Sequence, residues 1–280
     1  MGEITMDTIQ VQQVANQPRS TLSWLKRVGA AWLTTAILGQ GLFAFYILVF
    51  YGGHALDANW QAWSNRMIHG IIEGDYLLNA AVFIHILLAF IISGLGPLQF
   101  VPQVRTNFPT FHRINGRFYL TSGVIISVSS IYMIWSREAI VGGLPGQIGT
   151  SLDGILVIIF AFITVRFAMA RKIKQHSRWA LRFFIVVSGV WFFRIIRGFW
   201  IIANNGTSPG SNANLTGPFD IALNFAGYLV PLLILEIYFY LQDHNKPMAR
   251  MIFTGVLFLL TLITAVGIYG AAKILWLPNL

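Results

Sequence analysis

The segment that decides the fold is residues 76–101, which read YLLNAAVFIHILLAFIISGLGPLQFV and contain no Asp, Glu, Lys or Arg. A helix that crosses the hydrocarbon core of a bilayer needs about 20 apolar residues. Six other stretches of the same kind occur along the chain. We therefore predict an all-α polytopic membrane protein, with residues 24–280 forming one bundle of seven transmembrane helices. The predicted spans are 27–51, 76–101, 116–136, 152–171, 179–203, 218–241 and 250–276.

The composition excludes several classes of protein. Hydrophobic residues make up 56% of the 280 residues and charged residues 10%, which is too little polar surface to cover a soluble globule. The net charge of +9 does not indicate a nucleic-acid partner, because the positive residues gather at the ends of the apolar runs. The chain has no cysteine, so disulfides, thiol chemistry and cysteine-bound zinc are absent.

The basic residues also predict an orientation. Lys and Arg are concentrated in the N-terminal segment and in every second connection, whereas the connections between hold few. Since cytoplasmic loops of membrane proteins are enriched in Lys and Arg, we expect the N-terminus in the cytoplasm and the C-terminus outside. The basic positions are Arg19, Lys26, Arg27, Arg105, Arg113, Arg117, Arg171, Lys172, Lys174, Arg178, Lys246 and Arg250.

Two segments outside the spans have patterns of their own. Residues 1–23 are polar and predict a disordered cytoplasmic tail. In residues 57–72, Trp60, Trp63, Met67 and Ile71 recur at steps of three and four, which predicts a short helix in the membrane interface. That helix is either an anchor or a lid that carries His69 over an outer cavity.

His85 is the first candidate site residue, because it lies near the middle of the second predicted span. An ionisable group at that depth is by default a functional candidate. The alternative is a purely structural role, as a neutral imidazole hydrogen-bonded to a neighbouring helix. Gly96 and Gln99 share its helical stripe. Glycine and proline in residues 94–100 permit a break or a close helix approach.

Arg194 and Arg197 lie three residues apart on one face of the fifth predicted span. Two buried guanidinium groups require anions. Asp75, Asp153 and Asp220 border spans at the same end of the bundle and are candidate partners for structural ion pairs. Alternatively, the arginines hold a carboxylate, a phosphate or a haem propionate.

A second polar layer is predicted near the cytoplasmic ends of the spans. Glu236, Arg166 and Arg182 lie at similar depth, so pairing would neutralise most of their charge. Two helix starts in this region resemble each other, HRINGRFY at residues 112–119 and HSRWALRF at residues 176–183. They suggest either an internal repeat or the usual basic residues of cytoplasmic helix starts. The candidate site residues here are Gln99, His112, Arg113, Arg117, His176, Arg182 and Glu236.

Small residues form a stripe along the third predicted span. Gly116, Gly123, Ser127 and Ser130 predict close helix packing and no binding site.

These motifs resemble those of one family. His85, the Gly-Pro-Leu-Gln-Phe run at residues 96–100, and the His-Arg-x-x-Gly-Arg run at residues 112–117 carry the similarity, together with His176, Trp179 and Arg182. The family consists of multi-pass membrane proteins, mostly bacterial, known as domain of unknown function 2306. The resemblance covers about residues 80–240. It implies a bacterial inner-membrane location and no established activity. Ser177 departs from the Arg expected after the second His.

Two functions remain open. The first is an intramembrane redox or cofactor-binding protein that holds haem b, with His85 as an iron ligand, or a quinone. Haem needs a second ligand, for which Met133 is the one candidate at depth. The second is a transporter or channel for protons or a small anionic solute, with a cavity lined by His85, Arg194, Arg197 and Glu236. A surface metal site made of His112, His176 and His244 is a weaker third hypothesis.

Overall fold

The computed structural model describes residues 6–67, 71–136 and 141–279, with side chains described from Ser20 onward. In chain order the helices are α1 (Met6–Tyr46), α2 (Gly53–Leu56), α3 (Trp60–Ser64), α4 (Tyr76–Gly94), α5 (Pro102–Asn107), α6 (Pro109–Ser136), α7 (Gly143–Met169), α8 (Ile173–Val187), α9 (Gly189–Ala203), α10 (Pro218–Asp243) and α11 (Pro247–Ala271). Short π-helical segments follow α1 and α11 at Ile47–Gly52 and Ala272–Trp276, and 3₁₀ turns occupy Gly96–Phe100 and Leu277–Asn279.

The predicted membrane-protein class is confirmed. Over the described residues, six helices are long and apolar enough to cross a membrane, and a seventh span results if α8 and α9 are counted together. All seven predicted spans coincide with these helices. The chain is therefore an all-helical, multi-pass integral membrane protein whose helices contact the lipid bilayer. The direction in which its two ends face stays a prediction.

Large apolar side chains cover the outer surface of the long helices, as the bilayer requires. Phe162 on α7 is 68% exposed, Leu233 on α10 60% and Phe258 on α11 56%. Water would make such exposure unfavourable by about 25 cal/mol for each Å² of apolar surface, whereas lipid tails impose no such cost.

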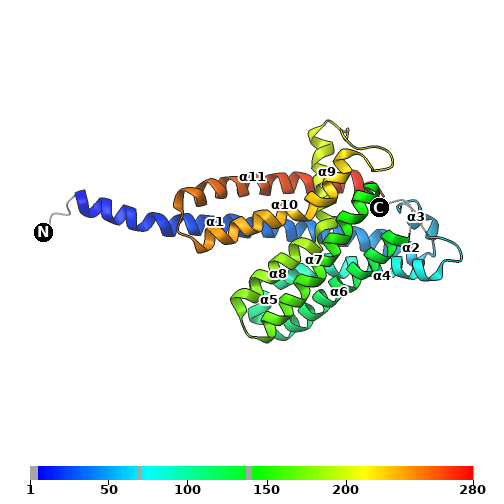
Figure 1. Ribbon diagram of the computed structural model, residues 1–280, viewed down its shortest axis with the longest axis horizontal. Coiled ribbons are helices and arrows are strands. Elements are labelled where there is room, and N and C mark those ends of the chain that lie inside the picture. The colour runs from blue at the N-terminus through cyan, green and yellow to red at the C-terminus, as the bar shows by residue number, and fades with distance from the viewer. Residues whose placement is uncertain (1–5, 68–70, 137–140, 280) are drawn as a thin grey trace.

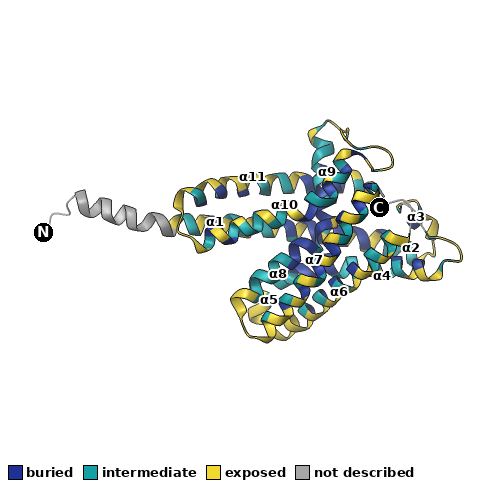
Figure 2. Cartoon of the chain, in the orientation of Figure 1, coloured by how far each residue is buried: buried dark blue, intermediate teal, exposed yellow. Residues whose placement is uncertain are grey.

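The helices form two groups that diverge from a common junction (Figure 1). Helices α4, α6, α7 and α8 pack in chain order as one group, and α1, α9 and α11 form the other. Helix α10 lies at the junction, where it contacts α7, α8 and α9. Buried residues gather where the groups meet, whereas the far ends are mostly exposed (Figure 2). Phe183, Phe184 and Val186 of α8 are fully buried there.

The fifth predicted span is not one straight helix. Helices α8 and α9 meet at Ser188 with a bend of 57°, so α8 packs in the first group and α9 in the second. Ser-Gly pairs are common sites of helix kinks. A buried hydrogen bond of 2.7 Å from Gln40 Nε2 of α1 to Ser188 Oγ links the bend to the other group.

The N-terminal segment and the connection after α1 differ from the predictions. Helix α1 begins at Met6, within the segment expected to be a disordered tail, and the four Gln residues and Ala15 there favour helix. Among the described residues of the predicted interfacial helix, 57–67 and 71–72, only the five residues of α3 are helical. Trp63 is buried and donates from Nε1 to the carbonyl of Tyr51, so the segment packs on the protein. The predicted lid residue His69 lies outside the described residues.

Glycines allow α9 and α11 to approach within backbone contact. A Cβ on Gly267 would lie 2.5 Å from the carbonyl oxygen of Ile195, and one on Gly198 would overlap the backbone of Ala271. In lipid there is no hydrophobic driving force between helices, so association depends on close van der Waals packing, which small residues permit.

We expect Gly267→Ala to lower the stability of the protein by about 1–3 kcal/mol, because the added methyl group overpacks the α9–α11 contact. The matched control is Gly255→Ala on the same helix, where an added Cβ meets nothing within 4 Å. Thermal unfolding in detergent measures both variants. Equal melting temperatures for the two would contradict this account of the contact.

Candidate functional site

A cavity of about 690 Å³ lies at the junction of the two helix groups. Its walls come from α1, α4, α6, α7, α9 and α10 and from the break between α8 and α9. It extends to Arg66, Met67 and Leu215, which belong to connections at the end of the bundle opposite the basic residues. Ligand pockets in proteins commonly have volumes of about 300–1,000 Å³.

His85 is one of the polar groups of this cavity. Its Nδ1 lies 3.2 Å from the hydroxyl oxygen of Ser130 on α6. When the serine hydroxyl donates this bond, the imidazole proton resides on Nε2, and His85 becomes a donor. Ser127 and Ser130 line the cavity, so the interpretation of the small-residue stripe as packing alone was wrong for these two serines.

The two arginines of α9 are in different electrostatic environments. Arg197 Nη1 donates at 2.7 Å to Asp220, whose carboxylate also accepts from Ser211 and from the backbone of Gly217. Of the candidate partners Asp75, Asp153 and Asp220, it is therefore Asp220 that forms an ion pair with Arg197.

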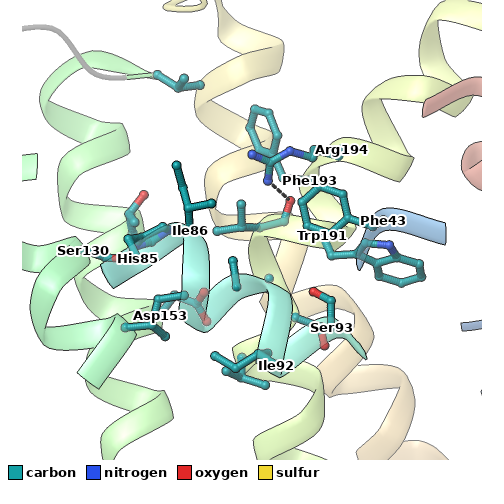
Figure 3. A pocket seen from close by; sticks show the side chains of 18 of the residues that line it. Phe43, His85, Ile86, Ile92, Ser93, Ser130, Asp153, Trp191, Phe193 and Arg194 are labelled. Atoms are coloured by element: carbon teal, nitrogen blue, oxygen red, sulfur yellow. Dashed lines mark hydrogen bonds between the residues drawn. The ribbon is translucent and has the colours of Figure 1, made fainter. Parts of the chain in front are cut away.

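Arg194 has no carboxylate within ion-pair distance anywhere in the described part of the chain. It donates to the carbonyl of Val190, and its guanidinium carbon lies 5.2 Å from the ring centroid of Phe43. In Figure 3, His85 and Ser130 lie on one side of the cavity, with Arg194 and Phe43 on the other.

Asp153 lies deeper than the sequence indicated. The predicted span began at residue 152, but α7 begins at Gly143, so Asp153 lies ten residues into the helix, a rise of roughly 15 Å. It is 9% exposed and lines the cavity. The sequence makes it a candidate partner for an arginine, but the structure shows no ion pair to it within the described residues. The first turns of α7 are rich in glycine and polar residues, so the sequence predicts a connection there and places Asp153 too near the end of the span.

Five residues that line the cavity each carry a buried polar atom that has no hydrogen-bond partner within the described part of the chain. These atoms are Gln40 Oε1, Asp153 Oδ1, Trp191 Nε1, Tyr228 OH and Trp276 Nε1. Buried polar groups are normally hydrogen-bonded, because each unsatisfied one costs about 1–3 kcal/mol. None of these five residues is among the predicted site residues, and the sequence indicated Asp153 only as a candidate partner for the arginines. A polar side chain inside an apolar run, as at Gln40, was the available signal.

Other predicted site residues form a separate polar cluster toward the basic end. With its amide oriented to satisfy all its neighbours, Gln99 donates to His112 Nδ1 at 3.1 Å and accepts from Asn115 and Gly116. His176 Nδ1 lies 3.1 Å from the carbonyl oxygen of Thr164. Gln99 therefore does not share a site with His85, although both lie on one stripe of the sequence. Gly96 instead packs directly against Tyr119.

The predicted pairing of Glu236 is confirmed. Arg182 donates to both of its carboxylate oxygens, at 2.6 and 2.7 Å, and stacks over Trp179. Neither residue lines the cavity, so the predicted inclusion of Glu236 in the cavity wall was wrong. Arg166, Arg113 and Arg117 are exposed and do not belong to this ion pair.

The donor set of the cavity fits a haem poorly. His85 is the histidine that lines it within the described residues. Met133 lines it as well, but follows Ser130 by one turn on the helix that contacts His85, so both side chains come from one wall. Axial ligands approach the iron from opposite faces of the porphyrin. The alternative metal site is also unsupported, because the described residues include no cluster of three His, Asp or Glu side chains.

Comparison with known proteins confirms the family resemblance over part of the chain. Residues 82–217 match the family model described as "Predicted membrane protein (DUF2306)". This segment runs from α4 to the connection before α10 and is shorter than the expected 80–240. It includes His85, Asp153, Arg194 and Arg197, whereas Gln40 and Asp220 lie outside it. No curated protein and no solved structure matches the chain.

The contrast between the two arginines predicts different effects on stability. Arg197→Met leaves the fully buried Asp220 carboxylate uncompensated, so we expect a loss of about 3–5 kcal/mol. Arg194→Met removes a charge that has no acidic partner, so stability stays unchanged or rises. Thermal unfolding of both variants in detergent tests this. A comparable loss in both would show that Arg194 is also held in a structural pair.

Proposed function

We propose that the protein binds a quinone-class molecule within the membrane, in the cavity at the junction of the two helix groups. The observation that carries this proposal is a mostly apolar cavity with His85 and Arg194 on opposite sides, where the Arg194 guanidinium has no carboxylate partner among the described residues. Ligand sites typically combine an apolar lining with a few convergent polar groups.

The chemistry of a quinone matches these groups. Its ring is flat and apolar, and each of its two carbonyl oxygens accepts hydrogen bonds. His85 Nε2 supplies a donor from one wall, and the Arg194 guanidinium supplies donors from another. Phe43 and Trp276, whose ring centroids are 5.1 Å apart, add aromatic surface for packing against a ring. Haem is less well supported, because the described residues place no second axial ligand opposite His85.

Binding of a short-chain, water-soluble quinone analogue tests this proposal. Two tryptophans line the cavity, so bound quinone quenches intrinsic fluorescence saturably in the purified protein. We expect His85→Leu and Arg194→Met each to weaken binding by about ten- to hundredfold, because each removes a donor from a buried site.

The control variant is Arg166→Met, which removes an exposed arginine outside the cavity and leaves affinity unchanged. Wild-type protein that shows no saturable quenching contradicts the quinone proposal. An absorbance spectrum after expression with ample haem is the companion measurement, and a Soret band lost in His85→Leu would favour haem instead.

Uptake of a small anion is a second candidate function, favoured by the lack of an acidic partner for Arg194. Arg66 lies at the end of the same cavity and adds positive charge there. If this function holds, the protein in liposomes takes up labelled carboxylates, and Arg194→Met abolishes uptake while Arg166→Met does not. Uptake equal to that of protein-free liposomes contradicts it.

A further inference from the structure

We propose that Asp153 is a proton-binding site of the cavity, and that its protonated carboxyl group donates a hydrogen bond to the bound ligand. The first statement stands on the structure of the helix break. The second rests on the proposed quinone binding, because it needs a ligand oxygen as the acceptor.

The carboxyl group of Asp153 lies against the start of α9. A Cβ on Gly189, the first residue of α9, would lie 2.5 Å from Asp153 Oδ2, so only glycine leaves room for it. Gly227 of α10 packs near the carbonyl oxygen of the same glycine. The N-terminus of a helix carries a partial positive charge, which stabilises a carboxylate placed beside it. The break thus supports the ionised form.

The other oxygen supports the protonated form. Oδ1 is buried and has no hydrogen-bond partner, and the side chain forms none of the ion pairs found within the described residues. A carboxylate with one bare oxygen in an apolar site is costly, and taking up a proton removes this cost. Both charge states are therefore partly satisfied, as a reversible proton site requires.

The groups that face this site from the surrounding helices are mostly cationic or neutral. Tyr228 of α10 is close enough to interact electrostatically with Asp153, α4 contributes His85, and α9 contributes Arg194 and Arg197. The walls from α1 and its π-helical extension add Tyr46 and Tyr51, and the connection after them adds Arg66. Helix α6 contributes serines. Asp153 is the one carboxyl group among the described residues of the lining.

This arrangement gives the proton a definite effect on binding. A quinone carbonyl accepts from the neutral carboxyl group and repels the ionised one. Ligand binding therefore favours the protonated state, and affinity falls as pH rises through the titration of Asp153 in the free protein. For one linked proton, the decrease approaches about tenfold for each pH unit.

The test compares quinone-analogue affinity across pH in wild-type protein, Asp153→Asn and Asp153→Leu. The Asn amide keeps a donor that does not titrate, so we expect affinity that is retained and independent of pH. The Leu side chain has no donor, so we expect affinity lowered about tenfold or more at low pH. The proposal is overturned if affinity in Asp153→Asn depends on pH as it does in wild-type protein. If this pH dependence is lost in His85→Gln but kept in Asp153→Asn, the proton belongs to His85.

A second measurement separates this site from the ligand. The infrared difference spectrum between low and high pH of ligand-free protein contains the carbonyl stretch of any carboxyl group that titrates. We expect one such band in wild-type protein that is missing in Asp153→Asn and present in Asp57→Asn, an exposed control. This result holds even if no quinone analogue binds, in which case only the proposed function fails. A spectrum of Asp153→Asn identical to wild type overturns the proton site.

Discussion

The bend between α8 and α9 is the constraint on which the rest of the structure depends. Because the chain turns by 57° at Ser188, α8 completes the group of α4, α6 and α7, whereas α9 packs with α1 and α11. The hydrogen bond from Gln40 to Ser188 ties the two groups together at this point. Backbone groups freed at a helix break must be satisfied within the protein or by a cavity, since lipid offers no hydrogen bonds. The cavity lies beside this break, and that position explains why polar side chains from six helices converge there.

Charge is distributed over the molecule in two ways. Two arginines are neutralised in ion pairs, Arg182 with Glu236 outside the cavity and Arg197 with Asp220 at its wall. Arg194 and Asp153, which also line the cavity, have no ion-pair partner among the described residues. In a medium of low polarity, unpaired charges are retained at a cost in stability, and such residues in membrane spans commonly mark pathways and binding sites. The same contrast motivates both the proposed ligand site and the proposed proton site.

Much of the fold could be predicted because span length and hydropathy are local properties. The positions of His85, Arg194 and Arg197 at depth followed from them directly. The depth of Asp153 did not, because the first turns of α7 contain Gly143, Pro145, Gly146 and Gly149 and read as a connection. The partners of the polar residues were predictable only for the charged ones, because few acidic residues, among them Asp220 and Glu236, were available to pair with the arginines. Gln40, Trp191 and Trp276 gave little signal, because one polar atom in an apolar run is also compatible with packing.

By itself, the amino-acid sequence determined the medium of this protein and the segments that cross it, since a run of about 20 apolar residues is stable only in lipid. The tertiary structure decided where the helices break and which polar groups meet. Ser122-Gly123 lies within the unbroken helix α6, whereas Ser188-Gly189 separates α8 from α9, although the dipeptide is the same. At Gly123 the neighbouring helix fills the space with Phe183, whereas at Gly189 the carboxyl group of Asp153 fills it and the hydrogen bond from Gln40 to Ser188 holds the bend. These contacts come from residues distant in the chain, so no local pattern encodes them.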